Sequence, residues 1–412
     1  MAERFTIRSK GNSMFPLLMD GDIVEFGRIS SKDIESNDIV LIFQNGVFIT
    51  HRVLYIKKHS VITKGDNNKK ADKEIPLDNV FAKAFRFKRR GAWFGISDIY
   101  SSQSLVYSKE ILTVSTLLQQ SKIPHVFIKG LVASLKYVQR FPQRIYSDID
   151  LLIEREDFLK VKEVFNSAGY SEYTDLWLSF KKQASLPKFE VDFVKTIRKV
   201  PIVFDIHLEP VFLMIKMDGM GLLYKKIKRK ELGSHFIKNK KWLSLLGGKV
   251  PVCSPIDQVI YLSLHIFHNN FTDIVRLRFV NEIIHSNITP RMWADMNTVI
   301  KKYSLQGYIY PVFSLLRKYF NTKIPSQMTA EKGLNGYKKY AALFVIKNGN
   351  VFNGSTRIMG GIIRLLFIVI FSPEPFYKKI VLSIHPDTIK SLFWVFIKKI
   401  YSTVKKQPIQ RD

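Results

Sequence analysis

Short apolar runs separated by turn residues fill residues 1 to about 90. The runs are rich in β-branched and aromatic side chains, as strands are: Ile23–Phe26, Ile39–Phe43, Val47–Ile49, Val53–Ile56 and Val61–Thr63. Between them lie turn signals at Asp20-Gly21-Asp22, Ser36-Asn37-Asp38 and Asn45-Gly46. Asn-Gly between two apolar runs is typical of a two-residue hairpin. The pattern predicts a compact all-β unit.

The spacing of apolar residues changes after the basic run Arg86 to Arg90. It predicts helices at 105–120, 131–139 and 155–168, and strands at 126–128, 150–153, 189–194 and 203–207. Beyond Ser254, a helix N-cap followed by Pro255, the pattern is mainly helical. We therefore expect a multidomain protein: an all-β domain at 1–90, an α+β domain at 91–330 and a helical, basic C-terminal region at 331–412.

Charge adds a preference for anionic partners. The chain has 64 Lys and Arg against 35 Asp and Glu, a formal net charge of +29. Such a surplus favours nucleic acid, nucleotide phosphates or anionic lipid without choosing among them. No recognition-helix, zinc-finger or RNA-binding-sheet signature accompanies it, so nucleic acid is the partner we rank last. The single cysteine, Cys253, excludes an intrachain disulfide and a cysteine-based zinc site.

No segment has the length and apolarity of a membrane span. The strongest candidate, Ile358 to Phe371, is 14 residues long and contains Arg364. The start of the chain, Met1 to Lys10, is charged throughout and lacks the apolar core of a signal peptide. The segment Asp387 to Lys406 is a basic amphipathic helix candidate, which can dock on anionic membrane or pack on its own domain. We expect a cytoplasmic protein with peripheral membrane contact as an option.

The first candidate site combines a serine, a histidine and carboxylates. A serine hydroxyl becomes a nucleophile when a base removes its proton, and His51 titrates in the right range for that work. A carboxylate beside the imidazole would fix its tautomer, and either Asp72 or Asp66 could supply it. Ser13 lies before the first expected strand, in a loop where backbone N–H groups can stabilise an oxyanion.

These residues fall into three ordered boxes: Ser13-Met14-Phe15-Pro16, His51-Arg52-Val53, and Lys64-Gly65-Asp66-Asn67 with Asp72 beyond. The arrangement resembles type I signal peptidases of the archaeal and endoplasmic-reticulum kind across residues 10 to 84. The resemblance implies a signal-peptidase-like fold with Ser13 as nucleophile, His51 as general base, Asp72 as its partner and Asp66 as a second supporting acid. It also implies a peptide or protein substrate and no cofactor. Members that cleave translocating proteins carry a membrane anchor before the serine box, whereas this chain begins about ten residues ahead of it.

The second candidate site is built on paired aspartates. Asp148 and Asp150 lie at i and i+2 at the start of an apolar strand, so both side chains point to one face. Two adjacent carboxylates favour a divalent cation, and Mg²⁺ held in this way can bind triphosphate oxygens. Asp205, on another expected strand, could complete the site. Gly130 would let the backbone approach a phosphate, with Lys129 and Arg144 as countercharge.

The boxes Lys129-Gly130, Arg144-x-x-Ser-Asp-x-Asp-Leu-Leu and Asp205-x-His207 resemble the DNA-polymerase-β-like nucleotidyltransferase superfamily. More narrowly, they resemble an uncharacterised bacterial nucleotidyltransferase family over roughly residues 110 to 330. The resemblance implies metal binding by Asp148, Asp150 and Asp205 and a nucleoside triphosphate as substrate. The superfamily's usual Gly-Ser turn is Lys-Gly here.

Other residues compete for parts of this site. Asp192 and Glu209 are alternatives to Asp205 as the third carboxylate; we prefer Asp205 because it lies in an apolar strand and precedes His207. His265 and His268, three residues apart on an expected helix, have no third partner indicated by spacing. We interpret them as core or surface histidines.

Two classes of function follow. In the first, a Ser-His-Asp endopeptidase is fused to a Mg²⁺-dependent nucleotidyltransferase, a combination suited to the maturation of a peptide. In the second, one or both sites are degenerate and the chain is a non-catalytic scaffold that binds a peptide or a nucleotide. Mg²⁺-dependent consumption of nucleotide would discriminate the two.

Overall fold

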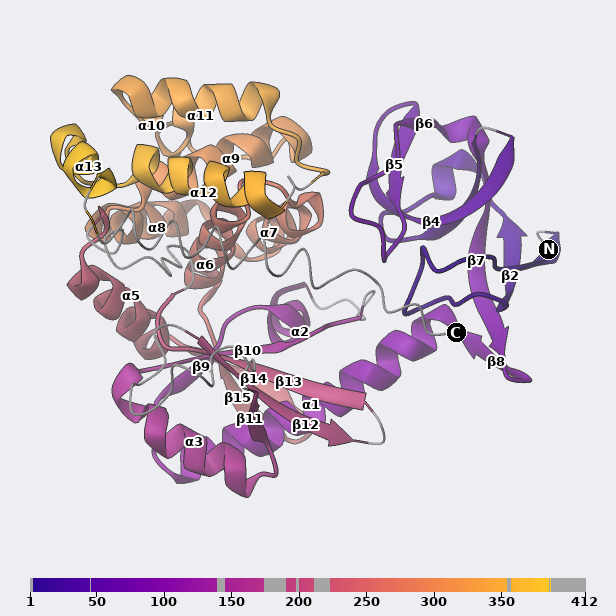
Figure 1. The fold of residues 1–412 in the computed structure, drawn as a ribbon, viewed down its shortest axis with the longest axis horizontal. Coiled ribbons are helices and arrows are strands. Elements are labelled where there is room, and N and C mark those ends of the chain that lie inside the picture. The colour runs from indigo at the N-terminus through magenta and orange to yellow at the C-terminus, as the bar shows by residue number, and fades with distance from the viewer. Residues whose placement is uncertain are drawn as a thin grey trace. The chain divides into compact units, whose positions relative to one another are not determined.

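The computed structural model describes residues 3–44, 46–138, 145–173, 190–197, 200–210, 223–353, 357–384 and 386. The contacts divide the chain into two compact units. Unit 1 comprises Met1–Lys109, Gln139–Tyr146 and Asn350–Gly354; unit 2 comprises Glu110–Val138, Ser147–Gly349 and Ser355–Asp412. Figure 1 shows the strands of the first unit in indigo and purple.

Unit 1 is built on an antiparallel sheet whose strands run in the order β1-β2-β7-β3-β4-β5-β6, with β8 paired to β7 (Figure 1). The strands are β1 (Arg4–Arg8), β2 (Ile23–Arg28), β3 (Ile39–Gln44), β4 (Val47–Ile56), β5 (Ser60–Lys64), β6 (Ile75–Pro76), β7 (Val80–Arg89) and β8 (Ala92–Gly95). The expected β-rich N-terminal region is therefore present.

Strand β3 has a continuous apolar sequence rather than an alternating one. Ile39 and Leu41 belong to one buried cluster, whereas Val40 and Ile42 belong to another. Successive side chains of a strand point to opposite faces, so β3 is covered on both faces. The first cluster also contains Tyr100 from the start of helix α1 (Ile96–Gln120).

Two details of unit 1 differ from the expectation. The segment Val47 to Ile56 is one strand, because the polar box around His51 continues the pairing with β3 instead of interrupting it. A strand that the sequence reading missed, β1, pairs with β2 and precedes Ser13. Ser13 therefore lies in the connection between β1 and β2. The alternating exposed and half-buried pattern of β1 reflects its place at the edge of the sheet.

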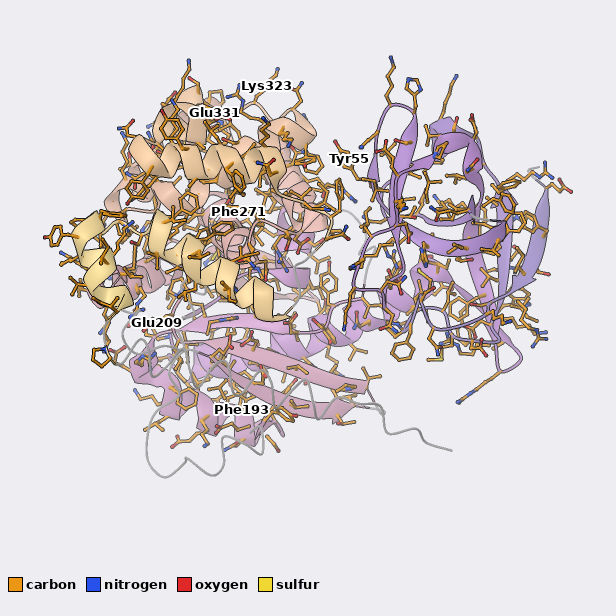
Figure 2. The ribbon with its side chains drawn as sticks, turned by 45° about the horizontal axis from the view of Figure 1, so that its top comes forward. Tyr55, Phe193, Glu209, Phe271, Lys323 and Glu331 are labelled. Carbon is orange, nitrogen blue, oxygen red and sulfur yellow. The ribbon has the colours of Figure 1, made fainter. Side chains whose placement is uncertain are left out.

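Unit 2 contains a mixed sheet with the strand order β11-β12-β13-β10-β9-β15-β14. Its strands are β9 (His125–Phe127), β10 (Ile149–Ile153), β11 (Ser171–Tyr173), β12 (Glu190–Ile197), β13 (Val200–His207), β14 (Lys241–Leu245) and β15 (Gly248–Val252). Strand β10 is parallel to β13 and antiparallel to β9. Phe193 of β12, labelled in Figure 2, packs against Phe165 of α3 (Phe158–Ser167), with ring centroids 4.8 Å apart.

Helices form the rest of unit 2, and the expected helical C-terminal part is confirmed for the described residues. Besides α3 and the end of α1, they are α2 (Gly130–Ala133), α5 (Lys226–Lys238), α6 (Pro255–His268), α7 (Ile274–Asn287), α8 (Pro290–Lys302), α9 (Gln306–Phe320), α10 (Ala330–Gly333), α11 (Gly336–Asn348), α12 (Arg357–Phe371) and α13 (Phe376–Ser383). The predicted N-cap is confirmed, since the Ser254 hydroxyl accepts from the Asp257 N–H at 3.2 Å.

Some predicted features fall outside the described residues. These are Asn45 of the predicted hairpin turn, Arg144 of the proposed nucleotide site and the basic segment Asp387 to Lys406. Among the helices that are described, none is both long enough and apolar enough to cross a membrane.

Candidate functional site

Three aspartates lie side by side on the sheet of unit 2. Asp150 of β10 is paired in register with Asp205 of β13, and Asp205 is paired with Asp192 of β12. In-register residues on adjacent strands project to the same face, so these carboxylates form a row across three strands. His207 lies two residues after Asp205 and therefore shares this face. We call Asp148, Asp150, Asp205 and His207 the acidic centre.

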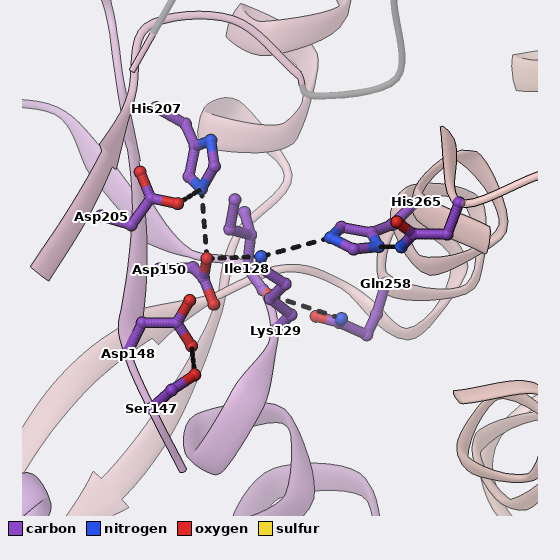
Figure 3. Close-up of polar contacts among 10 residues, drawn as sticks. Ile128, Lys129, Ser147, Asp148, Asp150, Asp205, His207, Gln258 and His265 are labelled. Atoms are coloured by element: carbon purple, nitrogen blue, oxygen red, sulfur yellow. Dashed lines mark hydrogen bonds and ion pairs between the residues drawn. The ribbon is translucent and has the colours of Figure 1, made fainter. Parts of the chain in front are cut away.

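His207 connects two of these carboxylates. Its Nε2 is 3.1 Å from Asp150 Oδ1 and 3.1 Å from Asp205 Oδ2 (Figure 3). Burial disfavours a charged imidazole, but the charges of Asp205 and Asp150 outweigh it and raise the pKa of His207 to about 9. His207 is therefore an imidazolium at neutral pH in the absence of metal.

Lys129 supplies the second cation. Its Nζ is 2.6 Å from Asp150 Oδ1, the oxygen that also faces His207. Burial opposes the charge of this lysine, and the carboxylate of Asp150 overcomes that effect and raises the lysine pKa. The same two cations hold the pKa of the fully buried Asp150 below its usual range, against the effect of burial. The following Gly130 has φ 67°, in the left-handed region that favours glycine.

Asp148 lies nearby but has a different partner. Its Oδ1 accepts a hydrogen bond of 2.9 Å from Ser147 Oγ (Figure 3). Burial, followed by the charge of Asp150, raises the pKa of Asp148. The pKa of Asp192 is raised to about 6 by burial and by Asp205. Glu209 is directed elsewhere, because it pairs with Arg155 at 3.4 Å and Arg229 at 3.3 Å.

Asp150, Asp205 and His207 form a group with metal-ligand geometry. One ligand atom from each lies within 4.8 Å of the others. Asp205 Oδ1 is buried and has no hydrogen-bond partner among the described residues, so this carboxylate keeps a vacant acceptor besides the Oδ2 that faces His207. Carboxylate oxygens of this kind fit a divalent cation such as Mg²⁺. Period-2 spacing could have included His207 in the predicted set, whereas its contact with Asp150 depends on strand register.

Helix α6 packs beside Lys129 at the acidic centre. His265 Nε2 is 3.4 Å from Lys129 Nζ (Figure 3). The side-chain amide of Gln258 donates to the carbonyl of Ile128 at 3.4 Å, next to Lys129. Burial, assisted by Arg276 and Lys129, lowers the pKa of His265 well below its usual value, so the ring is neutral. The interpretation of His265 as an ordinary core or surface histidine overlooked this position, which only tertiary contacts reveal.

Unit 1 brings the residues of the serine site together. His51 Nδ1 is 2.6 Å from Asp72 Oδ2, and the Thr63 hydroxyl donates to the same oxygen at 2.6 Å. A Cβ atom on Gly65 would lie 2.6 Å from the Ser13 carbonyl oxygen and 2.9 Å from His51 Nε2. The Ser13 carbonyl oxygen and His51 Nε2 therefore both lie close to Gly65, and a larger residue at this position would collide with both.

Asp66 contacts Arg52 rather than His51. The Arg52 guanidinium donates from Nε to Asp66 Oδ1 at 2.7 Å and from Nη2 to Oδ2 at 2.6 Å. It also donates to the Asn37 carbonyl at 3.0 Å and to the Tyr100 hydroxyl at 2.8 Å. Burial opposes the charge of Arg52, but its hydrogen bonds to Asp66 keep its pKa raised. Asp66 thus links Arg52 to the loop that carries Gly65, whereas Asp72 is the carboxylate in contact with the imidazole.

The region that contains the acidic centre is similar to known nucleotidyltransferase-like sequences. No curated protein matches the chain. The crystal structure of an antigenic nucleotidyltransferase-like protein from Paracoccidioides brasiliensis is similar at 10% sequence identity and a TM-score of 0.32, covering 54% of this chain and 94% of that one. A model of a family described as uncharacterised nucleotidyltransferases matches residues 87–321, more than half of the chain, and includes the acidic centre. The chain therefore belongs to this uncharacterised nucleotidyltransferase family.

Proposed function

We propose that the acidic centre carries out metal-dependent nucleotidyl transfer. The observation that carries the proposal is the in-register row of Asp150, Asp205 and Asp192 across three strands, within the region that matches the family. Like charges at this spacing are unfavourable unless cations neutralise them. A site that gathers carboxylates on one face is suited to a metal ion and its nucleotide.

Asp148, Asp150 and Asp205 would hold the metal. When bound, Mg²⁺ would neutralise the phosphate oxygens and stabilise the charge that develops during transfer. Lys129 already lies 2.6 Å from Asp150 and would contribute countercharge to the phosphates. The left-handed backbone at Gly130 provides a close approach for a phosphate oxygen.

The reaction needs an acceptor hydroxyl and a base. The hydroxyl oxygen forms a bond to the α-phosphorus of the nucleotide, and the bond from that phosphorus to the pyrophosphate oxygen breaks. The acceptor proton passes to a carboxylate, and Asp205, whose Oδ1 is buried without a hydrogen-bond partner among the described residues, is the group we assign. Asp192, which is paired with Asp205 on β12, would lie close to the transferred proton.

The test is consumption of nucleoside triphosphate with Mg²⁺, measured as pyrophosphate release, for the wild-type chain, Asp150→Asn and Asp205→Asn. Asp295→Asn, which removes an exposed carboxylate from α8, is the matched control. We expect both site variants to lose activity by about a hundredfold or more, on the order reported for lost electrostatic stabilisation. Equal activity in all four proteins would overturn the assignment. Nucleotide binding without turnover in the wild type would support the scaffold alternative.

We propose a second function, serine endopeptidase activity, for unit 1. The specific observation that favours it is the Asp72–His51 contact of 2.6 Å together with the placement of His51 Nε2 and the Ser13 backbone close to one another beside Gly65. In this scheme His51 takes the Ser13 proton, and the serine oxygen bonds to the scissile carbonyl carbon. His51 then returns the proton to the leaving amine as the peptide bond breaks. Water releases the acyl group in the reverse sequence.

An acylating active-site probe read by intact mass tests this function. We expect one adduct on the wild type and on Ser31→Ala, a control at an exposed serine, and none on Ser13→Ala or His51→Ala. An adduct that persists in Ser13→Ala would place the reactive group elsewhere. No adduct on any protein would leave unit 1 as a peptide-binding scaffold. A peptide that is cleaved by unit 1 and modified by unit 2 would connect both activities in one maturation pathway.

A further inference from the structure

A row of nitrogen-bearing side chains leads away from the acidic centre along helix α6. It begins at Lys129, whose Nζ is 3.4 Å from His265 Nε2. The rings of His265 and His268, one helical turn apart, have centroids separated by 6.4 Å. His268 Nε2 then accepts a hydrogen bond of 2.9 Å from Arg364 Nη1 of helix α12. We call His265, His268 and Arg364 the basic row.

Arg364 has an incomplete set of partners. Among the described residues no carboxylate lies within ion-pair distance of this guanidinium, and its buried Nε has no hydrogen-bond partner. Burial lowers its pKa from the usual value, yet an arginine stays charged at neutral pH. A partly buried guanidinium without a carboxylate partner among the described residues is costly, so this arrangement indicates a missing negative charge.

The backbone beside the basic row is strained. Asn270 and Phe271, in the connection from α6 to α7, have φ 58° and 60°, and Asp273 has φ 150°. Asn270 Nδ2 donates to the Gly360 carbonyl at 2.8 Å, which fixes this connection to α12 near Arg364. The side chain of Phe271 lies among the helices in Figure 2 and contacts Phe367 of α12, with centroids 5.4 Å apart. Strain of this kind persists where the surrounding structure holds it, often at binding sites.

We propose that the basic row is a binding site for the phosphate chain of a nucleoside triphosphate. The proposal rests on the nucleotidyl transfer proposed above and adds the residues that recognise the nucleotide. The acidic centre attracts the metal that accompanies a triphosphate, and the basic row, which is continuous with Lys129, supplies the complementary charge for the phosphates beyond it. Arginine suits this role because its planar guanidinium donates several hydrogen bonds to phosphate oxygens at once.

The chemistry also excludes some ligands. The described residues of the basic row contribute donors and a positive charge but no carboxylate, so a cationic or purely apolar ligand would lack a partner. Because the basic row is continuous with Lys129, an anion bound to it would extend towards the metal-binding carboxylates. The expected ligand is therefore a chain of phosphates with one end at the acidic centre.

Calorimetric titration of the full chain with ATP and with inorganic tripolyphosphate, each with Mg²⁺, tests the site. We expect Arg364→Gln to weaken both ligands by about tenfold to a hundredfold, the effect of losing a charge-assisted hydrogen bond. Arg364→Lys should recover part of the affinity because it keeps the charge. Arg291→Gln, which removes an exposed arginine from α8, should bind like the wild type.

The outcomes separate this inference from the proposed function. If the wild type binds ATP and Arg364→Gln binds equally well, the basic row is not the phosphate site, although nucleotidyl transfer stands. If the wild type binds neither ligand, both proposals fail. Weakened ATP binding with unchanged tripolyphosphate binding would also overturn the inference, because it would assign Arg364 to the nucleoside. Should Arg364→Gln fail to fold, His268→Leu removes the imidazole that accepts from Arg364 and must weaken both ligands in the same way.

Discussion

His207 makes the stability of the metal-free protein depend on pH in a direction that can be worked out. The imidazole is 1% exposed and lies 3.1 Å from both Asp150 and Asp205. Burial alone would lower its pKa, but the two carboxylates raise it to about 9. In an unfolded chain a histidine titrates near pH 6.5. The folded protein therefore holds a proton that the unfolded chain releases between these two values.

The sign follows from this difference. The stabilisation by protonated His207 is fully present below about pH 6.5 and is lost as the pH rises through about 9. A difference of roughly 2.5 pKa units at about 1.36 kcal/mol each gives a loss of about 3 kcal/mol over this range. That is a large share of the 5–15 kcal/mol typical of a folded domain, so the effect is measurable.

Urea denaturation between pH 6 and pH 9.5 in the presence of EDTA is the assay, since a bound divalent cation would displace the proton. The wild type should lose about 3 kcal/mol of unfolding free energy for the transition of unit 2. His207→Gln should start lower and stay nearly flat, while His285→Gln, at an exposed histidine of α7, should follow the wild type. Equal slopes for the wild type and His207→Gln would refute the reasoning.

Two further predictions concern buried charges elsewhere. His125, 2% exposed on β9, has its pKa lowered to about 4 by burial, so its neutral form stabilises the fold above about pH 6.5. The free energy of unfolding should therefore fall by about 3 kcal/mol as the pH drops to 4. In acid denaturation, the stability of His125→Gln should depend less on pH than that of the wild type. Arg52→Met should destabilise unit 1 by about 3–5 kcal/mol in thermal unfolding, because it leaves Asp66 without its bidentate partner, whereas Tyr100→Phe should cost only about 1 kcal/mol.

Local patterns were sufficient to predict the strands that carry the sites. The run Leu151 to Ile153 predicted β10, and all residues of that strand are buried, on both faces, as a continuous apolar run indicates. The i, i+2 spacing predicted that Asp148 and Asp150 lie at its beginning; Asp150 is in the strand and Asp148 directly precedes it. The box Asp205-x-His207 likewise fell on β13. These are properties of single strands, which period-2 spacing describes well.

The contacts that define the chemistry depend on pairing between distant segments. Asp150 meets His207 because β10 and β13 are parallel and in one register, and a shift of one residue would turn His207 to the other face. Lys129 follows β9, the strand beside β10, and its Nζ contacts Asp150. His265, which approaches Lys129, lies on a helix more than a hundred residues later. No local pattern encodes such distances. Local residues likewise allowed either Asp66 or Asp72 as the partner of His51; the resemblance implied Asp72, and the structure places Asp72 beside the imidazole.

Two of the three carboxylates of the acidic centre are balanced by internal cations without a metal. Two carboxylates, Asp150 and Asp205, face two internal cations, Lys129 and protonated His207. A divalent cation that entered alone would have to displace the His207 proton and repel Lys129, so it would bind weakly. A phosphate chain that arrives with the metal changes this balance, because its negative charge gives Lys129 a new partner beside the basic row. Metal and nucleotide should therefore each raise the affinity of the site for the other, which links the acidic centre and the basic row as one binding unit.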